Sequence, residues 1–348
     1  MLRIDRQANS KVLDLLKENV IGTPGKGMLY SHTNIERKLS HIKDAYFASI
    51  QRPSYAVANI CFVHRIIRNL DNYYIRYFTF RESIRRQNAH YRKQPKKRVG
   101  KLSPFLNVME GKSFDQDPDK PSVIYSYIEP GNIRSIEMAE SYEFEVVRTF
   151  TTHLFSRFWP KQSSNVRRIN KDEVAAMREA LRAQYEGYSF YTDDNIFIED
   201  NYYVIEHENR IVAGLQAHPD EWHVYELPGV SGRLLLEIAS RMPILKRIFS
   251  KNYRFLTIEG IFILEGYEGF LENLIEAVLA KKNFYTAMLP LDVDSKLNEI
   301  ISKIDLGTLQ KLYTPKEIGV VVKFNNMKDG QKTEFTERPA YISAFDIG

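Results

Sequence analysis

Residues 85–101 concentrate charge that could bind an anion. The segment holds eight lysines and arginines and no acidic residue, with Gly100 near its end. It follows a strand-like stretch rich in Tyr and Phe and precedes an apolar, helix-like stretch at 102–109. A pyrophosphate binds where backbone N–H groups converge at a helix N-terminus, where glycine permits close approach and Lys or Arg supplies countercharge. The segment is therefore either such an anion-binding loop or a solvated basic loop.

The other reactive side chains form no familiar centre. Cys61 is the only cysteine, which excludes an intramolecular disulfide and a cysteine-based zinc cluster. Its apolar surroundings predict a small buried side chain. The histidines show no His-Glu-x-x-His spacing, and His218 and His223 flank a tetrapeptide expected to form a loop, so we expect no metal. A Gly-x-Ser-x-Gly elbow and a Walker-type loop are also absent from the sequence.

Length and composition predict two globular domains. The 348 residues exceed one typical domain, and 43% apolar with 27% charged residues permit buried cores. Residues 1–160 hold 26 basic and 16 acidic side chains, whereas the remainder holds 23 and 28, so an anionic ligand belongs to the first part. The sequence has neither a signal-peptide pattern nor a run of roughly 20 apolar residues. We therefore expect a cytoplasmic protein with no membrane partner.

The first part alternates between helical and strand-like patterns. Residues 144–158 contain no Gly, Pro, Asn or Asp on which to turn, so they predict one long strand. The other expected elements are helices at 9–19, 34–50 and 132–142 and strands at 55–68, 71–80 and 122–128.

A polar stretch at 160–168 is the expected linker, after which a similar order of elements restarts. The expected helices are 171–185, 234–249, 270–281 and 295–303, and the expected strands are 202–205, 210–218, 255–264, 285–291, 318–324 and 340–345. This repeat predicts an α+β fold of two tandem units, each a mixed, mostly antiparallel sheet flanked by helices. The predicted domains are 1–162 and 163–348.

Residues 123–158 resemble the last third of the GNAT superfamily, the acyl-CoA-dependent N-acyltransferases. In that family a strand ends in an Asn that opens a helix, and an aromatic residue begins the next strand about twelve positions on. Asn132 and Phe144 match these positions, and Ser135 and Met138 match small and apolar inward ones. The resemblance implies two tandem GNAT-like units and transfer of an acyl group from acetyl-CoA, or another acyl-CoA, to an amine. The second part resembles the fold in element order alone.

The resemblance also implies where CoA binds. The family's pyrophosphate loop reads Gln or Arg, two residues, Gly, one residue, then Gly or Ala. One register places Lys97 and Gly100 in this pattern, although Leu102 replaces the small residue, and the other register uses 86–89. The residues implied in cofactor binding are Phe80, Arg86, Lys97, Arg98, Val99, Gly100, Lys101 and Asn132.

Catalysis by direct attack needs a base, because the acceptor amine must lose a proton. Glu82 and Glu129, which end the two strands before and after the basic segment, are the candidates, and Glu82 could instead be an exposed partner of a neighbouring arginine. The family usually places a Tyr on the helix opened by the Asn to protonate the CoA thiolate. Ala139 stands there, and Tyr142, about one turn on, could either substitute or serve in packing.

The corresponding loop of the second part carries Glu265 and Glu268 but no Lys or Arg, which disfavours a pyrophosphate. We expect that part to shape the acceptor pocket or to pack against the first, and to supply the strand that the first unit lacks. The acceptor, a small molecule or a protein, is not specified by the sequence. Two other functions stay open: a GNAT-like binding protein without catalysis, and, less favoured, a nucleic-acid-binding protein that uses the basic segment.

Overall fold

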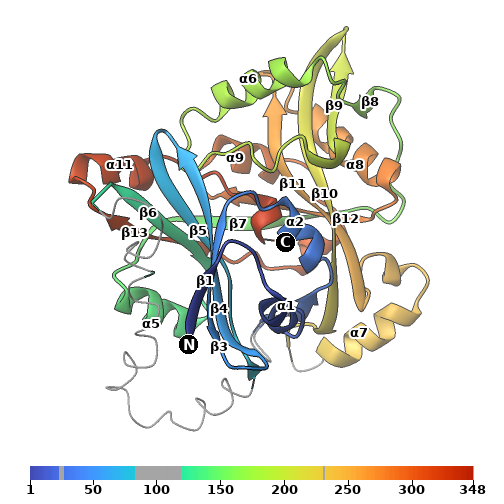
Figure 1. The fold of residues 1–348 in the computed structure, drawn as a ribbon. Coiled ribbons are helices and arrows are strands. Elements are labelled where there is room, and N and C mark those ends of the chain that lie inside the picture. Colours follow the sequence, from blue (N-terminus) through green and yellow to red (C-terminus); the bar gives the residue numbers. More distant parts are fainter. Residues whose placement is uncertain (23–26, 83–107, 109–118, 230–231, 348) are drawn as a thin grey trace. The chain divides into compact units, whose positions relative to one another are not determined.

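The structure, a computed structural model, describes residues 1–22, 27–82, 108, 119–229 and 232–347 (Figure 1). Its contacts divide the chain into two compact units. Unit 1 comprises Met1–Thr23, Leu29–Val147 and Gly319–Glu334, and unit 2 comprises Pro24–Met28, Arg148–Ile318 and Phe335–Gly348. Neither unit is one continuous stretch of chain. The domain boundary between residues 162 and 163 stays a prediction.

In unit 1 the strands lie in the order β1-β3-β4-β5-β6-β13. All neighbours are antiparallel except β5 and β6, which are parallel. The strands are β1 (Leu2–Asp5), β3 (Ala45–Gln51), β4 (Ala56–Ile67), β5 (Leu70–Phe80), β6 (Ser122–Ile128) and β13 (Ile318–Asn325), with β2 (Leu29–His32) outside this order. Among the described residues of this unit, the helices are α1 (Ser10–Lys17), α2 (Ile35–His41), α5 (Ile133–Ser141) and the start of α11 (Asp329–Glu337).

Unit 2 repeats this arrangement in the order β8-β9-β10-β11-β12-β7. Again one central pair, β11 and β12, is parallel and the other neighbours are antiparallel. The strands are β7 (Glu145–Ser156), β8 (Val166–Arg168), β9 (Tyr202–His207), β10 (Arg210–Glu226), β11 (Asn252–Ile263) and β12 (Thr286–Asp292). The helices are α6 (Val174–Gln184), α7 (Gly232–Arg241), α8 (Phe270–Lys282), α9 (Lys296–Ser302), α10 (Thr308–Leu312) and α12 (Ala344–Ile347), with short turns η2 (Ile198–Asp200) and η3 (Leu245–Arg247).

The two units therefore share one topology, strand for strand, with the parallel pair at the same place. This confirms the predicted α+β fold built from a tandem repeat of mostly antiparallel sheets flanked by helices. The single parallel pair needs a crossover, and in each unit the chain makes one between the two strands, which in unit 2 includes α8.

Each unit takes its last strand from the other part of the chain. Strand β7 follows α5 directly in sequence, yet from Phe150 to Ser156 it pairs with β12. Strand β13, near the end of the chain, pairs with β6 over seven residues, from Asn325↔Ser122 to Gly319↔Ile128. The expectation that the second part supplies a strand to the first unit is confirmed, as is the single long strand after Phe144. Residues 144–158 contain no Gly, Pro, Asn or Asp, so strand β7 could not turn back and pair with β6.

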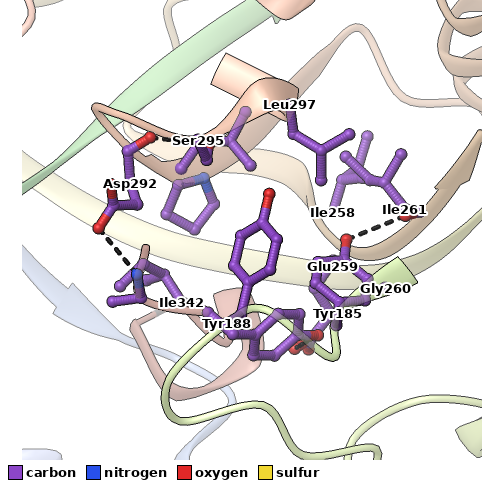
Figure 2. Close-up of a pocket in the computed structure, with 14 residues that line it drawn as sticks. Tyr185, Tyr188, Ile258, Glu259, Gly260, Ile261, Asp292, Ser295, Leu297 and Ile342 are labelled. Carbon is purple, nitrogen blue, oxygen red and sulfur yellow. Dashed lines mark hydrogen bonds between the residues drawn. The ribbon is translucent and has the colours of Figure 1, made fainter. Parts of the chain in front are cut away.

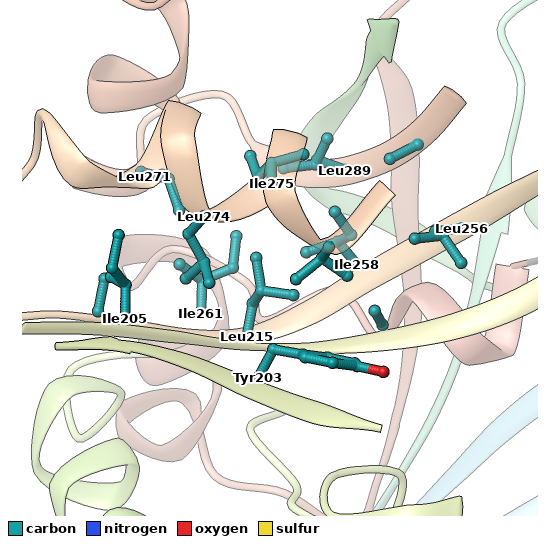
Figure 3. Packing of buried hydrophobic residues seen from close by; sticks show 14 of the residues in the cluster. Tyr203, Ile205, Leu215, Leu256, Ile258, Ile261, Leu271, Leu274, Ile275 and Leu289 are labelled. Atoms are coloured by element: carbon teal, nitrogen blue, oxygen red, sulfur yellow. The ribbon is translucent and has the colours of Figure 1, made fainter. Parts of the chain in front are cut away.

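Apolar faces of the helices pack on both sheets. In unit 2, Leu271, Leu274 and Ile275 of α8 point onto Ile205, Leu215 and Ile258 of the strands beneath, as Figure 3 shows. In unit 1, one sheet face packs around Phe62, Tyr73 and Ile124. On α1, the side chain of Asn9 accepts a hydrogen bond from the amide of Val12, so the helix starts there and turns Val12, Leu15 and Leu16 inward.

Three expectations about elements were wrong. The helix predicted at 34–50 ends at His41, and β3 begins at Ala45, because pairing with both β1 and β4 outweighs helix propensity. The predicted loop around His218 and His223 is part of the long strand β10. The strand predicted at 340–345 forms one bridge, Ser189↔Ala340, and then turns into α12.

Candidate functional site

The parallel strands β5 and β6 of unit 1 pair over only four residues before they part. Their partners run from Asp71↔Ser122 to Tyr74↔Tyr125. Beyond that point β5 continues to Phe80 and β6 to Ile128, and the Ser126 hydroxyl donates to the carbonyl of Ile75 at 3.3 Å. Beyond Tyr74 the backbone ladder between β5 and β6 ends, and the place where these two strands part is called the opening of unit 1 below.

A bulge in β5 accompanies this divergence. Tyr77 has a φ of 52°, a left-handed backbone conformation that is uncommon for a residue other than glycine. The register of β4 against β5 shifts there, between Asn59 and Cys61. The side-chain amide of Asn59, which is fully buried, donates to the Tyr77 carbonyl at 3.1 Å. Asn59 therefore holds the extra residue of the bulge in place.

Two predicted carboxylates follow the diverging strands. Glu82 lies two residues after the end of β5, Glu129 directly follows β6, and both side chains are exposed. Because the carboxyl ends of parallel neighbours lie at one edge of a sheet, both belong to the edge where the strands part. Phe80, the last residue of β5, is half-buried and packs on Phe78 with 5.1 Å between ring centres.

Asn132 is the N-cap of α5, as its motif predicts. Its side-chain oxygen accepts from the amide of Ser135 at 3.3 Å, and the residue is exposed. The N-terminus of this nine-residue helix follows β6 within a few residues, so its positive dipole end belongs to the same edge of the sheet.

Tyr142 lies at the other end of α5, in the core. It is 6% exposed, packs in the cluster that contains Phe144 and Ile124, and its backbone carbonyl accepts from the Lys323 ammonium at 3.0 Å. Burial raises the pKa of its phenol. These contacts are those of a packing aromatic, the alternative that the sequence left open. The remaining predicted residues, Arg86, Lys97, Arg98, Val99, Gly100 and Lys101, lie outside the described residues.

Unit 2 contains the equivalent opening, and its own side chains fill it. Strands β11 and β12 pair only at Leu256↔Ala287 and Thr257↔Met288, and Gly260, with φ of +56°, occupies the equivalent bulge. A Cβ on Gly260 would lie 2.7 Å from the end of the Ile196 side chain, so both this contact and the positive φ favour glycine there. The remaining cavity, drawn in Figure 2, measures about 20 Å³, room for roughly one water molecule.

The C-terminal segment occupies this opening through two buried carboxylates. Glu259 of β11 contacts the His218 ring at 2.7 Å and accepts from the Tyr341 hydroxyl and the Phe345 amide, both at 3.2 Å. Asp292 of β12 accepts from the Ala340 amide at 2.8 Å, the bond dashed in Figure 2. The segment from 340 to 345 thus bonds to both strands that part.

Asp292 also anchors the strand exchange within unit 2. The guanidinium of Arg148, on β7, donates to both oxygens of Asp292 at 2.7 and 3.0 Å, and this bidentate pair raises the pKa of the arginine.

In the loop before α8, the carboxylate of Glu268 accepts a hydrogen bond from the Gly266 amide at 3.3 Å. Glu268 therefore occupies a backbone N–H group that a bound phosphate would need. This contact of Glu268 disfavours a phosphate in the loop.

The sequence patterns did not indicate that Glu259 and His218 form a buried pair. The signal that could have found Glu259 is a lone carboxylate inside the apolar run of 255–264, since a buried charge needs a partner. Gln216 of β10 lies opposite Glu259, and His218 follows two residues later on the same strand. This proximity depends on the register of β10 with β11, which the sequence does not reveal. Among the described residues, no group of three or more His, Cys, Asp and Glu side chains is arranged to hold a metal ion.

Comparison with known proteins identifies the fold. No protein-family model and no curated protein matches the sequence. A GCN5-related glucosamine N-acetyltransferase region in a fungal multi-domain GH3 β-N-acetylglucosaminidase matches with a TM-score of 0.53 and 11% identity, over 92% of this chain and 38% of that chain. A GCN5-related N-acetyltransferase from Anabaena variabilis matches with a TM-score of 0.46 and 10% identity, over 93% and 72%. One from Sphaerobacter thermophilus gives 0.43 and 9%, over 80% of each chain. The chain has the GNAT fold.

Proposed function

On this fold, we propose that the protein is an acyl-CoA-dependent N-acyltransferase that binds acyl-CoA between β5 and β6 of unit 1. The observation that carries the proposal is the divergence of these parallel strands after Tyr74↔Tyr125, next to the bulge at Tyr77. Backbone groups of a parted strand can pair with an extended ligand as an added strand would. The amide-bearing arm of CoA is such a ligand. The equivalent opening of unit 2 is filled by residues 340–345.

The phosphate end of acyl-CoA would lie at the edge where β5 ends. The chain enters the basic segment 85–101 directly after β5, and the N-terminus of α5 adds a positive dipole there. We propose that Arg86, Lys97, Arg98, Val99, Gly100 and Lys101 supply the phosphate contacts, with Phe80 and Asn132 at the ends of the neighbouring elements. Acetyl-CoA is the simplest donor.

The reaction would proceed by direct attack. A neutral amine attacks the thioester carbonyl, the C–S bond breaks, the amine gives up its proton, and the thiolate takes one. Glu82 or Glu129 would accept the amine proton. For the thiolate we keep Tyr142 as the candidate acid, because burial raises its pKa and holds the proton on the phenol. Its core position favours a second candidate function, a GNAT-like protein that binds acyl-CoA without transferring the acyl group.

Binding and turnover separate these two functions. Acetyl-CoA at about a hundredfold its Kd should stabilise the protein by about 2.7 kcal/mol, seen as a rise in melting temperature. Release of the CoA thiol, followed by a thiol reagent against a panel of amines, reports transfer. Thiol release that depends on an amine supports the enzyme, whereas a thermal shift without thiol release supports the binding protein. No shift with acetyl-CoA, palmitoyl-CoA or CoA would overturn both.

The double substitution Lys97→Glu/Arg98→Glu tests the location. It should abolish the thermal shift, because it places two carboxylates where phosphates need countercharge. The matched control is Glu265→Gln/Glu268→Gln in the equivalent loop of unit 2, which should leave the shift unchanged. If the unit 2 variant lost the thermal shift and Lys97→Glu/Arg98→Glu kept it, the acyl-CoA site would belong to unit 2.

A further inference from the structure

Helix α7 of unit 2 exposes a row of apolar side chains. Leu234 and Ile238 are spaced by four residues, so their side chains are rotated by only about 40° around the helix axis. Together with Met242 and Ile244, which follow the helix, they are between 48% and 64% exposed. The opposite side of the same helix is already used, since Leu236 and Ala239 are buried. The exposed row is therefore a second apolar face, without a core to cover it among the described residues.

Cations surround this row. Arg233, Arg241 and Lys246 are exposed, and they lie beside or just beyond the apolar residues. The one acidic residue of the helix, Glu237, bonds to Lys251 and lies 3.9 Å from Arg241. Lys251 keeps the pKa of Glu237 below its usual value, so this acid stays ionised but paired. The surface offers apolar contact together with excess positive charge.

An exposed tryptophan adjoins the turn that follows α7. Arg247, in η3, lies over the Trp159 ring at 5.6 Å and donates to the carbonyl of Phe158 at 2.6 Å. Trp159 is 64% exposed. An indole beside basic and aliphatic side chains is the composition found where proteins meet the headgroup region of a bilayer.

We infer that α7, η3 and Trp159 form a docking surface for an anionic lipid surface. Charge complementarity decides the occupant: a second copy of the chain would bring the same cations against Arg241 and Lys246, whereas anionic headgroups neutralise them. The exposed apolar side chains would enter the boundary between the headgroups and the acyl chains, while the cationic side chains stay among the headgroups. At ten residues, α7 is about 15 Å long, so it would lie in the interface. Among the described residues no helix is long and apolar enough to cross a bilayer.

Sedimentation with vesicles tests this inference on the full chain. The protein should pellet with phosphatidylcholine vesicles that contain about a third phosphatidylserine, and not with phosphatidylcholine alone. Salt should weaken the binding, because the cations are exposed and therefore screened. Emission from Trp159 should shift to the blue on binding, and Trp159→Phe should remove the shift, since the other tryptophan, Trp222, is buried.

Matched variants localise the contact. Leu234→Ser/Ile238→Ser should lower the vesicle affinity about tenfold or more, and Arg241→Glu/Lys246→Glu should also lower it. The controls remove equally exposed groups elsewhere: Ile66→Ser/Leu312→Ser for the apolar pair and Lys171→Glu/Lys328→Glu for the charges. All these side chains are exposed, so an unchanged melting temperature verifies folding. The inference is overturned by equal loss in controls and test variants, by no binding to anionic vesicles, or by a dimer in solution that only Leu234→Ser/Ile238→Ser dissolves.

Discussion

The side-chain amide of Asn59 on β4 donates a hydrogen bond of 3.1 Å to the backbone carbonyl of Tyr77 on β5, and this bond holds the bulge beside which β5 leaves β6. The relationship ties a fully buried amide to the shape of the proposed acyl-CoA site.

Asn59→Leu should cost about 1–3 kcal/mol of unfolding free energy, because the Tyr77 carbonyl loses its side-chain donor inside the protein. It should also weaken acetyl-CoA binding, since the bulge is then free to take another register. Urea denaturation and calorimetric titration measure the two effects. Asn72→Leu is the control, because it removes a buried side-chain amide that donates to the carbonyl of Leu70 at the other end of the same strand. If Asn59→Leu lowered the stability and left the acetyl-CoA affinity unchanged, the bulge at Tyr77 would not contribute to acetyl-CoA binding.

Substitution of the candidate bases should affect the rate more than binding. If Glu82 or Glu129 accepts the amine proton, its change to Gln should lower kcat about 10²–10⁴-fold at neutral pH, with acetyl-CoA affinity retained. Tyr142→Phe keeps the aromatic ring in the core and removes only the hydroxyl. A fall in kcat with an unchanged melting temperature would identify an acid, and an unchanged kcat would leave Tyr142 a packing residue.

Removal of the donors around Glu259 should destabilise unit 2. His218→Leu leaves a buried carboxylate without its nearest partner and should cost about 3–5 kcal/mol, whereas Tyr341→Phe should cost about 1 kcal/mol. Fluorescence of Trp222, which packs on Phe255 in the same unit, follows the unfolding. If Glu259→Leu/His218→Leu were as unstable as His218→Leu alone, the unpaired charge would not be the cause.

His153 should make unit 2 less stable in mild acid. Burial lowers the pKa of its imidazole below 6.5, although its bond to Asn298 opposes this. The unfolded chain then binds the proton more readily than the folded one, so stability is full above about pH 7 and falls as the pH drops through 6.5. His153→Gln, which keeps a donor for Asn298, should flatten this slope between about pH 5 and 7. A slope that persists in the variant would assign the effect to another group.

Chains 1–162 and 163–348 should not fold as stable monomers when they are expressed apart. Each lacks the strand that completes its sheet, because β7 pairs with β12 and β13 with β6. The free edges of β6 and β12 should cause aggregation. Co-expression should restore a soluble complex, which gel filtration detects. Two well-behaved monomers would show that strand exchange is dispensable.

The type and order of most elements, the tandem repeat and the cap at Asn132 could be predicted from the sequence. These depend on local periodicity and on short-range hydrogen bonds, which neighbouring residues dictate. The sequence also showed that the run after Phe144 could not turn. In short segments with an ambiguous pattern, pairing with distant residues determines the secondary structure. Strand β3, for example, is a strand because β1 and β4 both pair with it.

Three features could not be predicted from the sequence: which strand completes the sheet of unit 2, where β5 bulges, and that residues 340–345 fill the opening of unit 2. All three depend on contacts between residues far apart in the chain, such as Glu259 with Tyr341. The enclosure of Tyr142 in the unit 1 core also depends on such contacts, whereas the sequence left this residue open as either an acid or a packing aromatic.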